Sequence, residues 1–410
     1  MQEYGDTSLA SYSRMNSMKT YIRFTGPFAL LFSILVLSAC SSGSSSAPPI
    51  DSNLSFSDQL QSVVDNAVAS GLPGVSLHLQ DGAEHINVVA GVVNRDTEEP
   101  MTSSSLSHAG SIGKTFTATM VIRLVDMGFL SLDDPIDLWL DSAMSAMIAD
   151  ADRITVRMLL AHTSGIQDYF NNPEFVRVFA EAPGGMWPPM EKLRYIDNAA
   201  NNFEPGAEYR YSNTNSLLAG VIAERVTGLS IGMALRQWVF EPAGLENTFG
   251  PYEDLGQPET MRGYVPESYY ETFDSDLDID LPTDGSDLDT TVWLNSEGDG
   301  DASVQSIPGD LNAFIRTLID TDTLVSGELK TQMMTESFPG SSEHGLGLFI
   351  TENGERFGHA GTGFGLHSWM IYAPSEDLSF ATIVNGSFGN YDELYNEYLN
   401  QLDLVLERRE

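Results

Sequence analysis

The sequence predicts an α+β fold in which both ends of the chain build one antiparallel sheet and the middle forms an inserted helical region. Two segments near the start alternate apolar and polar residues, as half-buried strands do, and the turn signal Asp81-Gly82 separates them. Four further strand patterns lie late in the chain. The expected strands cover residues 74–80, 86–93, 344–350, 356–361, 366–373 and 378–385.

Apolar residues spaced every three to four positions predict the helices. A first helix is expected to close at Gly71, and a second, starting near Ser111, to close at Gly128, because glycine readily adopts the left-handed conformation that ends a helix. Further helical patterns cover residues 157–165, 191–201, 215–228, 307–320 and 391–409. The expected organisation is a signal segment (1–39), a flexible tether (40–55) and one domain (56–405), with its sheet part at about 56–105 and 300–405 and its helical part at about 106–250.

Composition and charge limit the possible partners. The chain has 410 residues, of which 42% are hydrophobic, so it can bury a large core. Its formal net charge of -38 would repel nucleic acid and anionic lipid, and no nucleic-acid partner is expected. Residues 252–301 hold fifteen acidic side chains and a single basic one, Arg262, and are predicted to form a long solvated insertion. The run NSEGDGD (295–301) has the wrong residues at two ligand positions of a calcium loop, so no metal site is expected there.

The N-terminal region has the pattern of an export signal. Lys19 and Arg23 precede an apolar run over 28–39, which is shorter than the ~20 residues that a membrane span requires. The run ends in Leu37-Ser38-Ala39-Cys40 and resembles the bacterial lipoprotein box. The resemblance implies that Cys40 is lipidated and anchors the protein to a membrane, most simply the outer membrane facing the periplasm. An ordinary cleaved signal and a short anchor are the alternatives; with one cysteine, no internal disulfide can form.

A serine and a lysine lie three positions apart at the start of the second expected helix. The chain has only four lysines, and Lys114 follows Ser111 among small and apolar neighbours. Residues i and i+3 share one face of a helix, so the hydroxyl and the amine can meet without long-range folding. A neutral amine can take the proton of a serine nucleophile, and a helix start directs backbone N–H groups toward a developing oxyanion. The pair is therefore a candidate acylation centre.

Two further motifs supply the other groups that such a centre needs. Tyr211 and Asn213 form Y-x-N before an expected helix; a phenol beside an ammonium can act as a base, and an amide can position the lysine and a substrate carbonyl. His359, Gly361 and Thr362 form H-x-G-T at the end of an expected strand, where small residues let a substrate lie along the strand edge. The N–H of Thr362 is expected to face the N–H of the nucleophile across an oxyanion hole.

Each motif alone has a structural alternative, such as a helix N-cap or a buried histidine, but the order S-x-x-K, Y-x-N, H-x-G is much more specific. With this order the chain resembles the penicillin-recognising serine hydrolases over about residues 56–400. The resemblance is to the branch of class C β-lactamases, family VIII esterases and serine D-alanyl-D-alanine carboxypeptidases. Further stretches agree with it: GLPGVSLHL (71–79), LLAHTSGI (159–166), FEPGAEYRYSN (203–213), PAGLENT (242–248), HGLGL (344–348) and GHAGTGFG (358–365).

The resemblance implies a β-lactamase/transpeptidase-like fold and a role for each matching residue. By this resemblance Ser111 is the acylated nucleophile, and Lys114 and Tyr211 shuttle its proton. Asn213 is a contact for the substrate amide, and the H-x-G-T residues bind substrate along the strand. His162, within LLAHTSGI, is expected to be structural.

The H-x-G motif departs from the β-lactamase pattern. His359 stands in place of lysine and is a weaker fixed cation for a carboxylate, while Ala360 lacks the hydroxyl of threonine. The motif is closer to that of stand-alone carboxypeptidases. We therefore expect a D-alanyl-D-alanine carboxypeptidase-like enzyme acting on cell-wall peptides. The alternatives are a short-chain esterase, then a β-lactamase, and a non-catalytic envelope binding protein.

The sequence lacks the motifs of several other classes of protein. There is no G-x-S-x-G elbow of the α/β-hydrolases, and no helix pattern follows GTGFG (361–365), as a dinucleotide-binding loop would require. The seven histidines are scattered and the only thiol is Cys40, so no zinc site is visible. We expect no cofactor and a small peptide or ester as substrate; the oligomeric state stays open.

Overall fold

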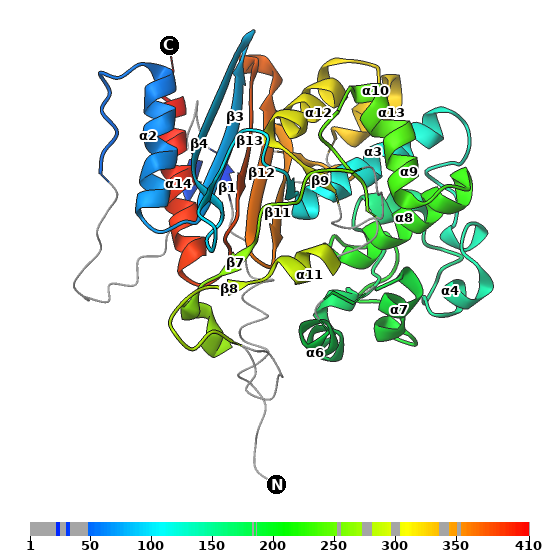
Figure 1. Ribbon diagram of the computed structural model, residues 1–410. Coiled ribbons are helices and arrows are strands. Elements are labelled where there is room, and N and C mark those ends of the chain that lie inside the picture. Colours follow the sequence, from blue (N-terminus) through cyan, green and yellow to red (C-terminus); the bar gives the residue numbers. More distant parts are fainter. Residues whose placement is uncertain are drawn as a thin grey trace.

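The computed structural model describes residues 48–182, 184–185, 187–251, 256–272, 281–296, 304–335, 344–350 and 354–409, and the backbone of strands β1 (Ile22–Phe24) and β2 (Leu30–Phe32). Its centre is a seven-stranded antiparallel sheet (Figure 1). The strand order is β10 (Phe349–Ile350), β11 (Phe357–Gly363), β12 (Leu366–Ala373), β13 (Leu378–Val384), β3 (Gly74–Asp81), β4 (Glu84–Asn94) and β5 (Glu99–Pro100).

The two ends of the chain meet in the middle of this sheet. Strand β13 pairs with β3 in an antiparallel register that places Thr382 opposite Leu77 and Val384 opposite Val75. Both strands are buried almost throughout, which agrees with their place in the middle of the sheet. The predicted α+β fold, with one antiparallel sheet formed by both termini, is confirmed.

Two helices cover one face of the sheet (Figure 1): α2 (Phe56–Ala69) and α14 (Asn390–Leu406). Helix α2 begins at Ser55, whose hydroxyl accepts a hydrogen bond from the Asp58 amide at 3.1 Å and so caps the first turn. Leu60 and Val64 of α2 are fully buried beneath the sheet and Leu402 of α14 is nearly so. Burial of each such side chain contributes roughly 1.5–3 kcal/mol.

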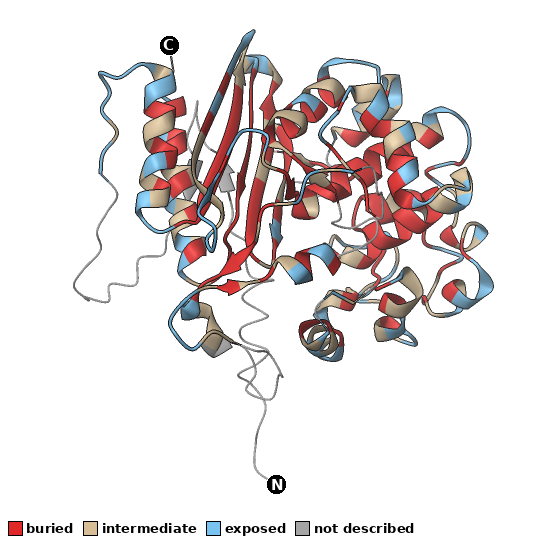
Figure 2. Ribbon diagram, viewed as in Figure 1, coloured by how far each residue is buried: buried red, intermediate tan, exposed pale blue. Residues whose placement is uncertain are grey.

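The opposite face carries the larger core and the helical region (Figures 1 and 2). Helix α12 (Pro308–Asp320) packs directly on strands β12, β13 and β3. Next come the short helix η1 (Gly110–Ile112) and helix α3 (Gly113–Asp126), and α3 packs on α8 (Asn213–Thr227). The remaining helices of this region are α4 (Ser142–Ala146), α5 (Val156–Leu160), α6 (Pro173–Glu181), α7 (Pro189–Leu193), α9 (Ile231–Leu235), α10 (Glu241–Ala243) and α13 (Gly327–Met333).

Three expected elements are shorter than their patterns. The helix expected over 157–165 ends at Leu160. Of the strand expected over 344–350, only Phe349 and Ile350 are extended, because Gly347 takes a left-handed φ of 70° and its backbone approaches Ala118 closely. The helix expected over 191–201 stops in a tight turn at Ile196, and Asn198 has a left-handed φ of 59°. Asparagine tolerates this conformation better than most residues, which favours a turn at that point.

The acidic segment is not solvated throughout: the expectation is wrong for residues 261–266 and 288–296, which are mostly buried, whereas residues 283–286 are exposed. Strands β7 (Tyr264–Val265) and β8 (Leu288–Asp289) pair, and helix α11 (Thr291–Ser296) buries Trp293 and Leu294 against the body of the protein. Buried aromatic and apolar residues among the acidic ones were the signal for this packing. The calcium-like run lies largely outside the described residues.

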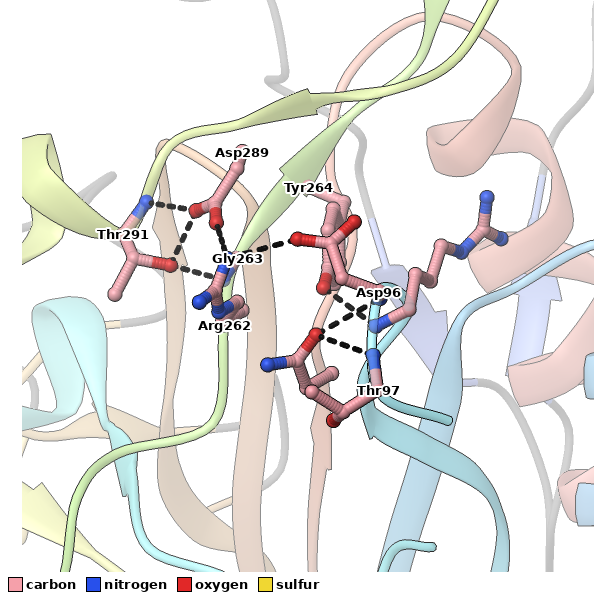
Figure 3. A network of polar contacts seen from close by, with 9 residues as sticks. Asp96, Thr97, Arg262, Gly263, Tyr264, Asp289 and Thr291 are labelled. Atoms are coloured by element: carbon pink, nitrogen blue, oxygen red, sulfur yellow. Dashed lines mark hydrogen bonds and ion pairs between the residues drawn. The ribbon is translucent and has the colours of Figure 1, made fainter. Parts of the chain in front are cut away.

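A polar network fastens this segment to the far edge of the sheet (Figure 3). Arg262, the single basic residue of the segment, pairs with Asp289 at 2.6 Å and with Asp96 at 3.2 Å. Asp289 also accepts hydrogen bonds from the amide and the hydroxyl of Thr291, which holds the start of α11. The Tyr264 hydroxyl accepts the backbone N–H of Arg95 at 2.7 Å. The segment is thus anchored beside β4 and β5.

The N-terminal predictions fall on a part of the chain that the structure leaves undescribed. Cys40 and most of the apolar run are outside the described residues. Within the described residues, no single helix is long and apolar enough to cross a membrane. Two consecutive helices, Asn213–Thr227 and Ile231–Ala243, meet the length and composition requirements only when taken together, and they are bent by 77°.

Candidate active site

Ser111 and Lys114 meet where η1 passes into α3. The Lys114 Nζ donates a hydrogen bond to Ser111 Oγ at 3.0 Å, so the contact expected from i, i+3 spacing is present. Lys114 is only 2% exposed, whereas most lysine side chains in proteins lie at the surface. Burial strengthens the electrostatic coupling of its amine to any group that approaches Ser111. The serine itself is partly exposed, as a nucleophile must be to meet a substrate.

Tyr211 joins this pair from a loop about one hundred residues later. The Lys114 Nζ lies 5.5 Å from the centroid of the Tyr211 ring. Tyr211 precedes α8, and because α8 packs on α3, the loop is held against the start of α3. The structure therefore brings together the three residues for which the sequence predicts proton transfer.

Strand β11 runs along η1 on the other side of Ser111. A Cβ atom added to Gly361 would lie 2.2 Å from the Ala109 carbonyl and 3.1 Å from the Ser111 nitrogen. Gly110 has a left-handed φ of 55°, and a Cβ there would lie 3.2 Å from the Thr362 nitrogen. Only glycine allows this approach. The backbone of Thr362 is thereby placed beside that of Ser111, as an oxyanion hole requires.

Asn213 is fixed by a residue that sequence reasoning did not single out. Its side-chain amide donates to Asp168 Oδ2 at 2.9 Å, while Oδ1 of the same carboxylate accepts the Phe170 amide at 3.0 Å. Asn213 is the first residue of α8 rather than its cap, which is Ser212. The predicted contact between Asn213 and the substrate stays a prediction. Asp168 follows LLAHTSGI closely in the sequence, and this is the signal that could have pointed to it.

His359 lies in the site but its imidazole is buried. The ring is 2% exposed and stacks on Phe349 with centroids 4.0 Å apart, and its Nδ1 lies 2.6 Å from the Ala360 carbonyl. A carbonyl only accepts, so Nδ1 carries the proton. Burial, then the neighbouring His344, holds the pKa of His359 well below 6.5 despite this hydrogen bond. A neutral imidazole offers no fixed cation for a carboxylate.

Two further histidines complete a cluster around Tyr211. His162 stacks on the Tyr211 ring at a centroid distance of 4.4 Å, and His344 meets His162 edge-on at 4.9 Å. Burial lowers the pKa of His344 to about 4 and that of His162 well below 6.5. In the described part of the chain, no three His, Cys, Asp or Glu side chains are arranged to hold a metal ion. His344 belongs to the HGLGL stretch, for which the sequence suggested no role.

The arrangement fits acyl transfer to a serine. In such a step Ser111 Oγ bonds to a carbonyl carbon while its proton passes to the Lys114–Tyr211 pair and then to the leaving group. By the prediction from the sequence, the carbonyl oxygen, which gains negative charge, would face the backbone N–H groups of Ser111 and Thr362. Water can then release the acyl group by the reverse sequence of proton transfers.

Comparisons with known proteins identify the family of this chain. The beta-lactamase family model matches residues 60–404, and the chain belongs to this family of serine hydrolases. Penicillin-binding protein 4* of Bacillus subtilis is 26% identical over 68% of the chain, and esterase EstB of Burkholderia gladioli is 28% identical over 51% of it. The matches span 61% and 57% of the lengths of these two relatives.

One solved structure aligns with this chain over almost the whole length of the relative. The D-amino acid amidase of Ochrobactrum anthropi SV3, solved in complex with L-phenylalanine amide, superimposes with a TM-score of 0.71 and 27% identity. The alignment covers 86% of this chain and 98% of the amidase. The amidase thus shares the fold of this chain.

Proposed function

We propose that this protein is a serine hydrolase that forms an acyl-enzyme on Ser111 and cleaves D-alanyl-D-alanine-type peptides of the cell wall. The observation that carries the proposal is the buried Lys114 amine, 3.0 Å from Ser111 Oγ and beside the Tyr211 ring. Relatives named as a penicillin-binding protein and a D-amino acid amidase support a substrate with a D-amino acid at the scissile bond.

Intact-mass spectrometry tests the acyl-enzyme. The protein is incubated with benzylpenicillin over a time course, beside the Ser111→Ala variant. We expect a serine-dependent adduct of long lifetime, because a peptidase that recognises penicillin is acylated by it and released slowly. An adduct that also forms on Ser111→Ala would disprove the assignment of Ser111 as the nucleophile. A brief adduct with consumption of the drug would indicate a β-lactamase instead.

A short-chain esterase is the second candidate, and one observation favours it. The buried, neutral His359 supplies no positive charge for the free carboxylate at the end of a D-alanyl-D-alanine peptide. Turnover of an acyl-D-alanyl-D-alanine acid, its C-terminal amide and p-nitrophenyl butyrate separates the candidates. A carboxypeptidase hydrolyses the acid best. Preference for the butyrate ester, with little turnover of either peptide, would make the protein an esterase.

The location of the enzyme is proposed from the N-terminal pattern. Export followed by lipidation of Cys40 would place the hydrolase domain near cell-wall peptides, at the end of a Ser-rich tether. Labelling of cells with a clickable fatty acid tests this proposal, and Cys40→Ala should abolish the label. Label that persists on the variant would contradict the anchor.

A further inference from the structure

His162 contacts the Tyr211 loop on both sides of the tyrosine. Its backbone carbonyl accepts the Arg210 N–H at 2.9 Å, and its Nδ1 accepts the Ser212 N–H at 3.2 Å. The amides immediately before and after Tyr211 therefore bond to one residue. The imidazole also stacks on the phenol ring, with an angle of 28° between the planes. Three separate contacts from His162 thus fix the position and the tilt of Tyr211.

A second hydrogen bond defines which nitrogen of His162 carries the proton. The Asn215 side-chain amide lies 3.1 Å from Nδ1, and its oxygen accepts the Ser164 hydroxyl at 2.6 Å. The Asn215 NH₂ group therefore faces the imidazole and donates to it. Since Nδ1 receives two donors, it holds a lone pair, and the proton of the neutral ring is on Nε2. Protonation of Nδ1 would break both bonds.

The backbone of His162 turns the chain at the end of α5. Its φ is 54°, in the left-handed region, directly after the last turn of the helix. Glycine and asparagine are common at this point, and histidine is also found in this conformation more often than most side chains. The turn brings the imidazole against the Tyr211 loop, where it makes the contacts described above.

We propose that His162 is a positioning residue for the proposed base Tyr211, holding its ring beside Lys114 through the two flanking amides and the stacked imidazole. The inference rests on the role of Tyr211 in the proposed function. It revises the expectation that His162 is only structural. The ionisable groups around this imidazole are Lys114, Tyr209, Tyr211, His344 and His359. In this setting the neutral ring holds the loop without adding a charge beside the lysine.

Two substitutions separate the contacts. His162→Asn keeps an acceptor near the position of Nδ1 and tolerates a left-handed φ, but it loses the ring. His162→Ala loses both the acceptor and the ring. The burst of p-nitrophenolate from p-nitrophenyl butyrate reports the acylation rate in each variant. We expect His162→Ala to acylate at least tenfold more slowly than wild type with little change in the dissociation constant of the substrate, and His162→Asn to recover part of the rate.

A double-mutant cycle distinguishes positioning from a general loss of stability. If His162 acts through the Tyr211 hydroxyl, His162→Ala should cost much less in a Tyr211→Phe background than in wild type. Equal losses in the two backgrounds, or a wild-type rate for His162→Ala, would overturn the inference. If Tyr211→Phe alone acylates at the wild-type rate, the roles proposed for Tyr211 as the base and for His162 as its positioning residue are both refuted. The serine-hydrolase proposal would still stand in that case, because Ser111 would still be acylated.

His78 provides the matched control. It is another buried histidine whose Nδ1 lies 2.7 Å from an asparagine amide, that of Asn312, but it sits in strand β3. His78→Ala should lower the free energy of unfolding as His162→Ala does and leave the burst rate unchanged. Loss of acylation in His78→Ala as well would show that any buried histidine has this effect, and would count against a specific role for His162.

Discussion

At the scale of single residues, the site depends on holding the Lys114 amine, the Tyr211 phenol and the Ser111 hydroxyl together among largely buried side chains. Lys114 is 2% exposed and lies against the Ser111 hydroxyl and the Tyr211 ring, with neutral imidazoles nearby. Burial disfavours the charged form of an amine and so favours the neutral form, which can accept a proton from serine. The neutral histidines around Tyr211 add to this burial.

The substitution Tyr211→Phe tests the phenol directly. It removes one oxygen and keeps the ring that stacks on His162, so the loop should stay in place. We expect acylation to slow by about 10²–10⁴-fold, the usual range for loss of a general base. The burst phase with p-nitrophenyl butyrate measures it. Tyr372→Phe is the control: its hydroxyl bonds to Asp320 at 2.8 Å on another helix, so it should affect stability and not rate. A wild-type burst in Tyr211→Phe would mean that Lys114 suffices alone.

At the scale of elements, the close packing of β11 against η1 brings the Thr362 backbone beside that of Ser111, where the proposed oxyanion hole would lie. The Ser368 hydroxyl of β12 donates to the Ala109 carbonyl at 2.7 Å and connects the sheet to the start of η1. The sequence predicted both elements, and that the two N–H groups face each other stays a prediction. The sequence did not predict the contact of Asp168 with Asn213 or the contacts of His162 with the Tyr211 loop. These contacts join loops that are brought together by the packing of α8 on α3.

Gly361→Ala should open this packing. The added methyl group would lie 2.2 Å from the Ala109 oxygen and 2.4 Å from Ser368 Oγ, so β11 must move away from η1. We expect a loss of about 1–3 kcal/mol of stability, typical of overpacking, and at least a tenfold lower acylation rate because the Thr362 N–H shifts. Urea unfolding and the burst assay measure the two effects.

Gly309→Ala is the matched control for that substitution. Gly309 lies in the first turn of α12, and a methyl group there meets its nearest atoms at 3.9 and 4.0 Å, which is ordinary contact. Alanine should be neutral or slightly stabilising at this position. Wild-type activity in Gly361→Ala would contradict the proposed geometry of the oxyanion hole.

At the scale of the whole molecule, the sequence predicted the layers better than the acidic segment. The expected strands near both ends of the chain alternate between apolar and polar residues, and the expected helices have apolar residues at helical spacing. The sheet and its two covering helices were therefore predictable from the pattern alone. In the acidic segment, charge suggested solvent, but Trp293 and Leu294 bind the segment to the core and Arg262 neutralises part of its charge. Local composition does not show which side chains of a charged segment meet a distant surface.

The buried histidines make the stability of the whole fold depend on pH. The pKa of His344 is lowered to about 4 from 6.5, and burial also lowers the pKa values of His108, His162 and His359. Below pH 6.5 the unfolded chain takes up protons that the folded chain excludes. Stability is therefore full above about pH 6.5 and falls as the pH drops toward 4. For His344 alone this amounts to about 2 kcal/mol between pH 7.5 and 5.

Urea unfolding at pH 7.5 and pH 5 measures this loss. His344→Gln removes one titrating imidazole from the core and should reduce the difference between the two pH values. Carboxylates that titrate in the same range affect both proteins alike, so the comparison isolates the buried ring. An undiminished pH dependence in His344→Gln would show that His344 is not held neutral by the fold.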